Sequence, residues 1–90
     1  MTIIATTVKE IRSMLPGNRR IGFIPTMGNL HLGHLELIRR SRQDNELTIV
    51  SSFVNPTQFN DKDDLKHYPR TDEDDFVKLE KENVDILFKP

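Results

Sequence analysis

Apolar and polar positions along the chain form blocks that predict strands and helices in turn. Residues 7–15, 34–44 and 71–83 carry apolar positions at helical spacing. Short apolar runs that favour strands lie between and beside them, at residues 2–4, 21–24, 47–54 and 84–88. The order strand, helix, strand, helix, strand predicts right-handed crossovers and a parallel sheet that is covered on both faces. We therefore expect an α/β fold with a parallel sheet and flanking helices.

Local signals mark the ends of these helices. Thr7 followed by Glu10 fits a capping box, and Pro16-Gly17 should end the first helix. Thr71 is expected to cap the third helix, and Asn83 is expected to end it in a left-handed conformation. The apolar positions of the helical patterns are Val8, Ile11, Leu15, Leu35, Leu37, Ile38, Phe76, Val77 and Leu79.

Two of the three histidines lie in one tetrapeptide, His31-Leu32-Gly33-His34. It follows the strand at residues 21–24 and the turn at residues 25–30, and a helix is predicted to begin near His34. A helix N-terminus after such a turn offers free backbone N–H groups and the positive end of the helix dipole to an anion. Two imidazoles there can bind phosphate oxygens and stabilise charge that develops as a phosphorus–oxygen bond breaks. The segment therefore predicts nucleotide chemistry.

Two other interpretations of the histidine pair stay open. The pair could be surface histidines at a helix cap, although Met27, Gly28 and Gly33 leave room for a ligand near the backbone. The pair could also share a zinc ion, with Asp63 or His67 as third ligand, but no zinc-ligand spacing surrounds it. We therefore assign no metal ligand. The turn also lacks both the Gly-Lys-Ser/Thr of a Walker A loop and the dinucleotide pattern of glycines.

A second loop should lie beside the histidine turn. It follows the strand at residues 47–54, begins with Asn55-Pro56-Thr57, and continues as a polar stretch over residues 58–70. One short helical turn is expected around residues 63–66. Ligands of parallel sheets bind beyond the carboxyl ends of the strands, where both loops should meet.

Charge and composition narrow the choice of partners and compartment. Thirteen basic and fourteen acidic residues give a formal charge of −1, which is no electrostatic footprint for nucleic acid. The absence of cysteine excludes disulfides and thiolate metal sites and fits a reducing compartment. No signal-peptide pattern begins the chain, and no apolar stretch approaches transmembrane length. We expect a cytoplasmic protein that binds neither nucleic acid nor membrane.

Three groups of residues resemble the pantothenate synthetase (pantoate–β-alanine ligase) family. The first is Pro25-Thr26-Met27-Gly28-Asn29-Leu30-His31-Leu32-Gly33-His34, and the second is Phe53-Val54-Asn55-Pro56-Thr57-Gln58-Phe59. The third comprises Asp64-Leu65, Tyr68-Pro69-Arg70-Thr71, Asp75, Leu79 and the segment 84–90. The His-x-Gly-His motif is shared with other nucleotidyltransferases and class I aminoacyl-tRNA synthetases, whereas the longer blocks are far more specific. All three groups follow the order and spacing of the family.

The resemblance implies a Rossmann-like domain of the nucleotidyltransferase type and a ligation in two steps. Pantoate attacks the α-phosphate of ATP, with Mg²⁺ on the phosphates, and β-alanine then attacks pantoyl adenylate to give pantothenate and AMP. His34 is implied to be a proton donor and His31 a phosphate ligand, while Gln58 and Asn55 are implied to serve the pantoate pocket. The implied ATP-lining residues are Met27, Gly28, Asn29, Leu30, His31, Leu32, Gly33 and His34.

Simpler interpretations remain for several of these residues. Asn55 precedes a proline and could be a turn residue, and Gln58 could belong to a solvated loop. Tyr68 and Arg70 could pack and pair structurally. The pair Asp74-Asp75 matches a helix dipole more often than it binds Mg²⁺.

Chains of this family are much longer, and their later Rossmann elements and closing domain have no counterpart here. We expect residues 1–90 to be the N-terminal portion of the nucleotide-binding domain, inactive alone and without the C-terminal domain. An uncovered sheet edge should favour self-association, such as a homodimer. The alternatives are another His-x-Gly-His nucleotidyltransferase and a non-catalytic nucleotide-binding or dimerisation module.

Overall fold

Four parallel strands form one sheet in the computed structural model, which describes residues 1–15, 17–68 and 71–90. The strands stand in the order β1-β4-β3-β2, and each neighbouring pair is parallel. The elements are β1 (Ile3–Ala5), α1 (Val8–Met14), β2 (Ile21–Thr26), α2 (Leu32–Asp44), β3 (Leu47–Ser52), the 3₁₀ helix η1 (Pro56–Gln58), α3 (Lys62–Lys66), α4 (Asp72–Lys81) and β4 (Ile86–Phe88). The predicted α/β fold with a parallel sheet is confirmed.

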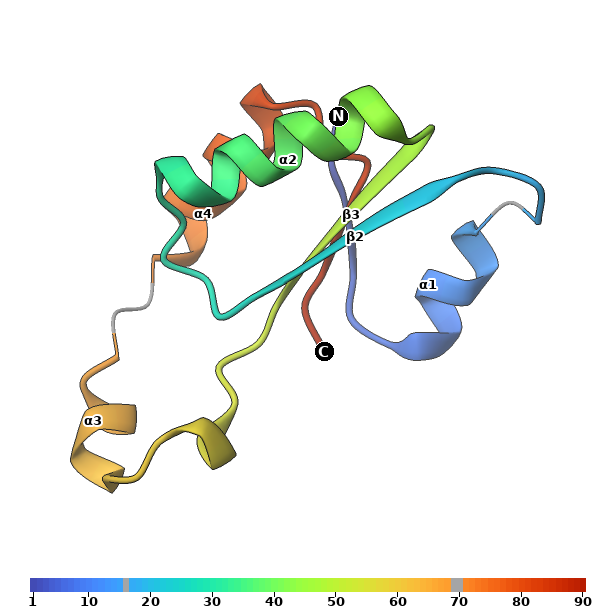
Figure 1. Ribbon diagram of the computed structural model, residues 1–90. Coiled ribbons are helices and arrows are strands. Elements are labelled where there is room, and N and C mark those ends of the chain that lie inside the picture. The colour runs from blue at the N-terminus through green and yellow to red at the C-terminus, as the bar shows by residue number, and fades with distance from the viewer. Residues whose placement is uncertain (16, 69–70) are drawn as a thin grey trace.

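The helices form a layer on each side of this sheet. Helices α2 and α4 lie on one face and α1 lies on the other (Figure 1). The first face holds the main core, made of Ile24, Leu30, Ile38, Val50, Leu79, Val84 and Leu87. The second face holds a smaller core, in which Ile11 and Met14 of α1 pack on Ala5, Ile49 and Ile86. Coverage of the second face is partial, since Phe23 of β2 remains 55% exposed.

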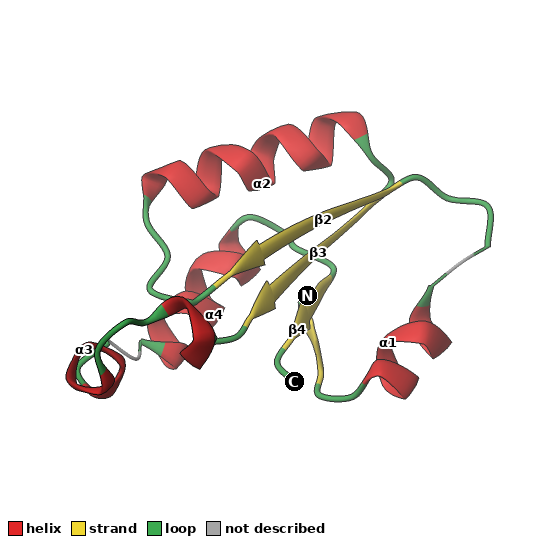
Figure 2. Cartoon of the chain, turned by 60° about the horizontal axis from the view of Figure 1, so that its bottom comes forward, coloured by secondary structure: helices red, strands yellow, loops and turns green. Residues whose placement is uncertain are grey.

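The carboxyl ends of β2 and β3 point the same way, as the arrowheads in Figure 2 show. The histidine turn leaves from β2 and the loop that contains η1 and α3 leaves from β3, so the two predicted site segments begin at one end of the sheet. In both figures α3 lies away from the sheet. None of the helices in the described part of the chain has the length and apolarity needed to cross a membrane.

Several strand boundaries differ from the prediction. Strand β2 continues through Pro25 and Thr26, which pair with Ser51 and Ser52 of β3. Proline is tolerated there because β2 is an edge strand, where a missing N–H can face away from the sheet. Strand β3 ends at Ser52 rather than Val54. Strand β1 is shifted by one residue, to residues 3–5, and β4 is shortened to residues 86–88.

The helix caps follow the sequence more closely. The Thr7 hydroxyl accepts a hydrogen bond from the Glu10 N–H at 3.0 Å, which confirms the predicted cap. Asn83 adopts the expected left-handed conformation, with φ of 57°. Thr71 occupies the N-cap position of α4, but its hydroxyl bonds to Asp75 instead of the helix backbone. Helix α1 ends at Met14, and the predicted terminator Pro16 lies outside the described residues.

Three predicted helix faces need correction. Val8, Leu37 and Val77 are more than half exposed, and Leu15 is 37% exposed. Met14 packs on the sheet in α1, where the apolar spacing indicates Leu15. Apolar character places a residue on a face only if the neighbouring layer reaches that face, and here the layers stop short of these side chains.

Candidate functional site

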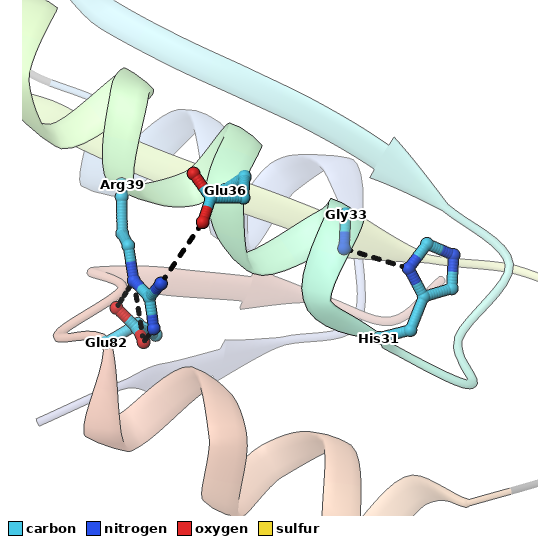
Figure 3. Close-up of polar contacts among 5 residues, drawn as sticks. All are labelled: His31, Gly33, Glu36, Arg39 and Glu82. Atoms are coloured by element: carbon cyan, nitrogen blue, oxygen red, sulfur yellow. Dashed lines mark hydrogen bonds and ion pairs between the residues drawn. The ribbon is translucent and has the colours of Figure 1, made fainter.

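The two histidines cap the N-terminus of α2 reciprocally. Nδ1 of His31 accepts a hydrogen bond from the Gly33 N–H at 3.0 Å (Figure 3). The His31 N–H donates to Nδ1 of His34 at 3.1 Å, and the two ring centroids lie 4.0 Å apart. Helix α2 therefore begins at Leu32, earlier than predicted, because the imidazole of His31 supplies the N-cap that serine, threonine or aspartate more often provides.

This arrangement determines the tautomer of both rings. A backbone N–H can only donate, so Nδ1 of each ring must be an unprotonated acceptor, and each neutral ring carries its hydrogen on Nε2. Burial lowers the pKa of His34, His31 acts in the same direction, and Asp75 opposes them. Within the described residues no protein group is hydrogen-bonded to either Nε2. The pair thus offers two N–H donors to an anion such as phosphate.

The turn before α2 uses its own backbone N–H groups within the fold. The Gly28 N–H donates to the Thr26 hydroxyl at 3.1 Å. The Asn29 and Leu30 N–H groups each donate to the carboxylate of Asp75 at 2.9 Å. An anion at this point would therefore meet the imidazoles and the N-terminus of α2 rather than open amides of the turn.

Asp75 and Lys78 of α4 are the contacts that the sequence analysis missed. Asp75 is 5% exposed, and Nζ of Lys78 donates to the Leu30 carbonyl at 2.9 Å. Leu30 itself is 4% exposed, so its side chain supports the turn from the core. A signal was present, because Asp75 lies one helical turn before the core residue Leu79 and so shares its buried face.

One open cleft joins the two predicted site segments. It has a volume of about 470 Å³ and is lined by Pro25, Thr26, Met27, Gly28, His34, Ser51, Phe53, Asn55, Gln58 and Tyr68. A neighbouring cleft of about 310 Å³ shares Met27, Gly28 and Phe53 with it and also includes Asn29, Asp72 and Lys89. A histidine of α2 and an amide side chain of η1 therefore face a common space large enough for a small ligand.

The residues after β3 combine structural and open positions. Oδ1 of Asn55 accepts hydrogen bonds from the Thr57 N–H at 3.0 Å and the Thr57 hydroxyl at 2.8 Å, so Asn55 caps η1 as a turn residue would. Gln58 is exposed at the cleft. Tyr68 packs edge-on against Phe59, with ring centroids 5.6 Å apart, and Arg70 lies outside the described residues.

The zinc interpretation requires a third ligand beside His31 and His34, such as Asp63 or His67. Among the residues that the structure describes, no three His, Asp or Glu side chains gather as a metal site requires. His67 instead bonds through Nδ1 to the Asp63 carbonyl within α3. Asp74 is exposed, whereas the neighbouring Asp75 has its oxygens occupied by hydrogen-bond donors.

Comparison with known proteins places this chain in a family. A family model for pantoate-beta-alanine ligase matches residues 3–90. The chain belongs to this family. Pantothenate synthetase of Photobacterium profundum is 52% identical over 97% of this chain, and the match covers 30% of that relative. Pantothenate synthetase of Brucella anthropi is 53% identical over 97% of the chain and 32% of the relative. The chain thus spans about a third of the length of these pantoate-beta-alanine ligases.

Solved structures of the same family match this chain over its whole length. The pantoate-beta-alanine ligase of Francisella tularensis, complexed with beta-gamma ATP and beta-alanine, matches with a TM-score of 0.93 at 45% identity, over 100% of this chain and 36% of that one. The pantothenate synthetase of Thermus thermophilus matches with a TM-score of 0.91 at 47% identity, over 100% of this chain and 32% of that one. The Rossmann-like architecture of the family is therefore present here.

Proposed function

We propose that this chain forms part of the site at which a pantoate–β-alanine ligase makes pantothenate from pantoate, β-alanine and ATP, releasing AMP and pyrophosphate. The observation that carries the proposal is the cleft that His34 and Gln58 line together. Family membership supports it, and the Francisella tularensis relative is complexed with an ATP ligand and with β-alanine. Residues 1–90 would belong to the nucleotide-binding domain of the longer ligase.

The first chemical step is transfer of the adenylyl group. A carboxylate oxygen of pantoate attacks the α-phosphorus, the bond to the bridging oxygen breaks, and pyrophosphate leaves. Nε2–H of His34 donates to the phosphate oxygens where negative charge develops, and Nε2–H of His31 holds the same group as a ligand. Mg²⁺ enters with the phosphates of ATP as part of the substrate.

The second step is attack of the β-alanine amine on the carbonyl carbon of pantoyl adenylate, with AMP as the leaving group. The ATP contacts come from the histidine turn and the start of α2. Besides the two histidines, the contacting residues are Met27, Gly28, Asn29, Leu32 and Gly33. Leu30 contributes through its place in the core rather than by touching the nucleotide, since its side chain is buried and its N–H and carbonyl are both bonded to α4.

Gln58 is proposed to bind pantoate, and Asn55 to hold η1 so that Gln58 faces the cleft. An amide can donate to and accept from a hydroxy acid at once. We expect Gln58→Ala to raise the KM for pantoate about ten- to a hundredfold, because an unpaired group costs roughly 1–3 kcal/mol. Initial rates at varied pantoate and ATP check this. Asn60→Ala, which removes an exposed amide outside this cleft, is the control. A raised KM for ATP alone would contradict the assignment.

A homodimer and a cytoplasmic location complete the proposal. Strands β1 and β2 are the edges of the sheet and carry exposed apolar side chains, Ile4 at 45% and Phe23 at 55%, so an open edge and the apolar face beside it are both available for association. We expect Phe23→Lys to shift the protein towards monomer in sizing chromatography with light scattering. An unchanged mass, or a monomeric parent, would contradict a dimer through this edge. Cytoplasm is where ATP is available and where a cysteine-free chain is at no disadvantage.

The test of the activity is exchange of labelled pyrophosphate into ATP by the protein that contains this chain. We expect exchange only when pantoate is present, and AMP release only when β-alanine is added as well. Exchange that follows a different carboxylic acid would replace pantoate as the substrate. ATP binding without any exchange would instead favour the non-catalytic nucleotide-binding module.

A further inference from the structure

We propose that Asp75 and Lys78 are positioning residues, which hold the histidine turn from α4 so that both imidazoles face the nucleotide. The role of the positioning in nucleotide binding rests on the proposed function, whereas the contacts that hold the turn do not depend on it. Helix α4 carries no residue of the His-x-Gly-His motif, yet it bonds to the backbone of Asn29 and Leu30, the two residues directly before His31.

The carboxylate of Asp75 takes three hydrogen bonds. Oδ1 accepts from the Leu30 N–H at 2.9 Å, and Oδ2 accepts from the Asn29 N–H at 2.9 Å and from the Thr71 hydroxyl at 3.1 Å. Backbone N–H groups can only donate, so both oxygens of Asp75 must act as acceptors towards the turn, as an ionised carboxylate does. Asp75 is 5% exposed, and such a buried charge is tolerated because these donors satisfy it.

The turn that Asp75 holds has an unusual backbone. Gly28 and Asn29 have φ of 78° and 51°, so two consecutive residues are left-handed. Glycine adopts this conformation freely, whereas a left-handed Asn29 is less common and is favoured here by the hydrogen bond from its N–H to Asp75. A Cβ on Gly28 would lie 3.3 Å from Oδ2 of Asp75 and 3.2 Å from Oγ of Ser52, so the turn closes tightly against α4 and β3. Release of the carboxylate would remove the contacts that favour this conformation.

Lys78 completes the attachment. It follows Asp75 by three residues on the same side of α4, and its Nζ donates to the Leu30 carbonyl at 2.9 Å. The N–H and the carbonyl of Leu30 are thus both bonded to α4, immediately before the residue that caps α2. Farther along, Arg39 of α2 pairs with Glu82, Nη2 to Oε1 at 2.6 Å, which fixes α2 to the C-terminal end of α4 (Figure 3).

The carboxylate of Asp75 also has an electrostatic effect on the pKa of His34. The groups that act on this imidazole are His31 from its own turn and Asp75 from α4, with Lys78 nearby on the same helix. Burial and His31 lower the pKa of His34, and the Asp75 carboxylate raises it. Removal of that negative charge should therefore lower the His34 pKa further. A residue with a purely structural role would have no such effect.

The test compares Asp75→Asn with Asp74→Asn. The second variant is a matched control, because it also removes one negative charge, at the exposed position directly before Asp75. Proton NMR of the chain follows the His34 titration and the amide signals of Asn29 and Leu30. We expect Asp75→Asn to lower the His34 midpoint and shift both amides, because the new NH₂ group cannot accept from a backbone N–H. Adenylation in the ligase should fall at least tenfold with a smaller change in the KM for ATP. Asp74→Asn should leave the His34 midpoint, both amide signals, the adenylation rate and the KM for ATP at wild-type values.

Lys78→Met covers the case in which Asp75→Asn does not fold. It keeps the carboxylate, removes only the bond to the Leu30 carbonyl, and should shift the Leu30 region and lower adenylation without lowering the His34 midpoint. Wild-type amide signals and titration in a folded Asp75→Asn protein would overturn the inference, and so would an equal effect of Asp74→Asn. If the variants shift the amide signals and the His34 midpoint as expected but the protein shows no pantoate-dependent exchange, the positioning role stands and the proposed function is rejected.

Discussion

Replacement of His34 by alanine is expected to lower the rate of adenylation about 10²–10³-fold, the usual cost of losing a donor aimed at developing charge. The affinity for ATP should change little. The reason lies in the fixed tautomer, since the His31 N–H occupies Nδ1 of His34 and leaves Nε2–H for the phosphate. That donor counts most when negative charge appears on the transferring group. Single-turnover formation of the adenylate at saturating ATP measures the chemical step, and equilibrium binding measures affinity.

Two further variants keep this result interpretable. His67→Ala removes the third histidine, which is exposed at the C-cap of α3, and should leave the rate unchanged. Helix α3 itself lies away from the sheet (Figure 1). His34→Gln retains an N–H donor and should restore part of the lost rate. The His34→Ala change also removes the acceptor of the His31 N–H, which helps to cap α2. Thermal unfolding of each variant should therefore accompany the kinetics. An unchanged single-turnover rate in a folded His34→Ala protein would remove His34 from the mechanism.

Replacement of Ile38 by alanine is expected to destabilise the chain by about 2–5 kcal/mol, the range for large-to-small changes in a packed core. Ile38 is 0% exposed and lies in the main core with Ile24, Val50 and Leu79. Its loss leaves a cavity between α2 and the sheet. Domains are stable by only about 5–15 kcal/mol in total, so this single change should remove much of the margin.

Urea unfolding of the same chain checks this figure, with Leu37→Ala as the control. Leu37 is the neighbouring residue on α2 and is 57% exposed, so its loss should cost no more than about 0.5 kcal/mol. Similar destabilisation by both changes would mean that α2 does not pack on the sheet through Ile38. The same helix presents both histidines at its N-terminus, so the Ile38 variant should lose ligand affinity as it loses structure.

Local sequence patterns were enough to predict the order of the elements, the parallel sheet and the meeting of the two loops at one end of it. Examples are the β-branched run at residues 47–54 and the turn at residues 25–30 before the histidines. Parallel strands then bring the two loops that follow them to the same end of the sheet, which is why Asn55 and Gln58 could be expected beside His34. The caps at Thr7 and Asn83 also depend on neighbouring residues only.

Long-range packing, in contrast, determines which polar groups the turn keeps for a ligand. Asp75 is one of four acidic residues in a first helical turn, yet it lies 46 and 45 residues away from the amides that it binds. Leu37 and Val77 have the right spacing for a core and still face solvent. Local patterns fix a residue's place on its own helix, but burial and hydrogen-bond partners depend on what the other layers bring to that place, and those contacts join residues far apart in the chain.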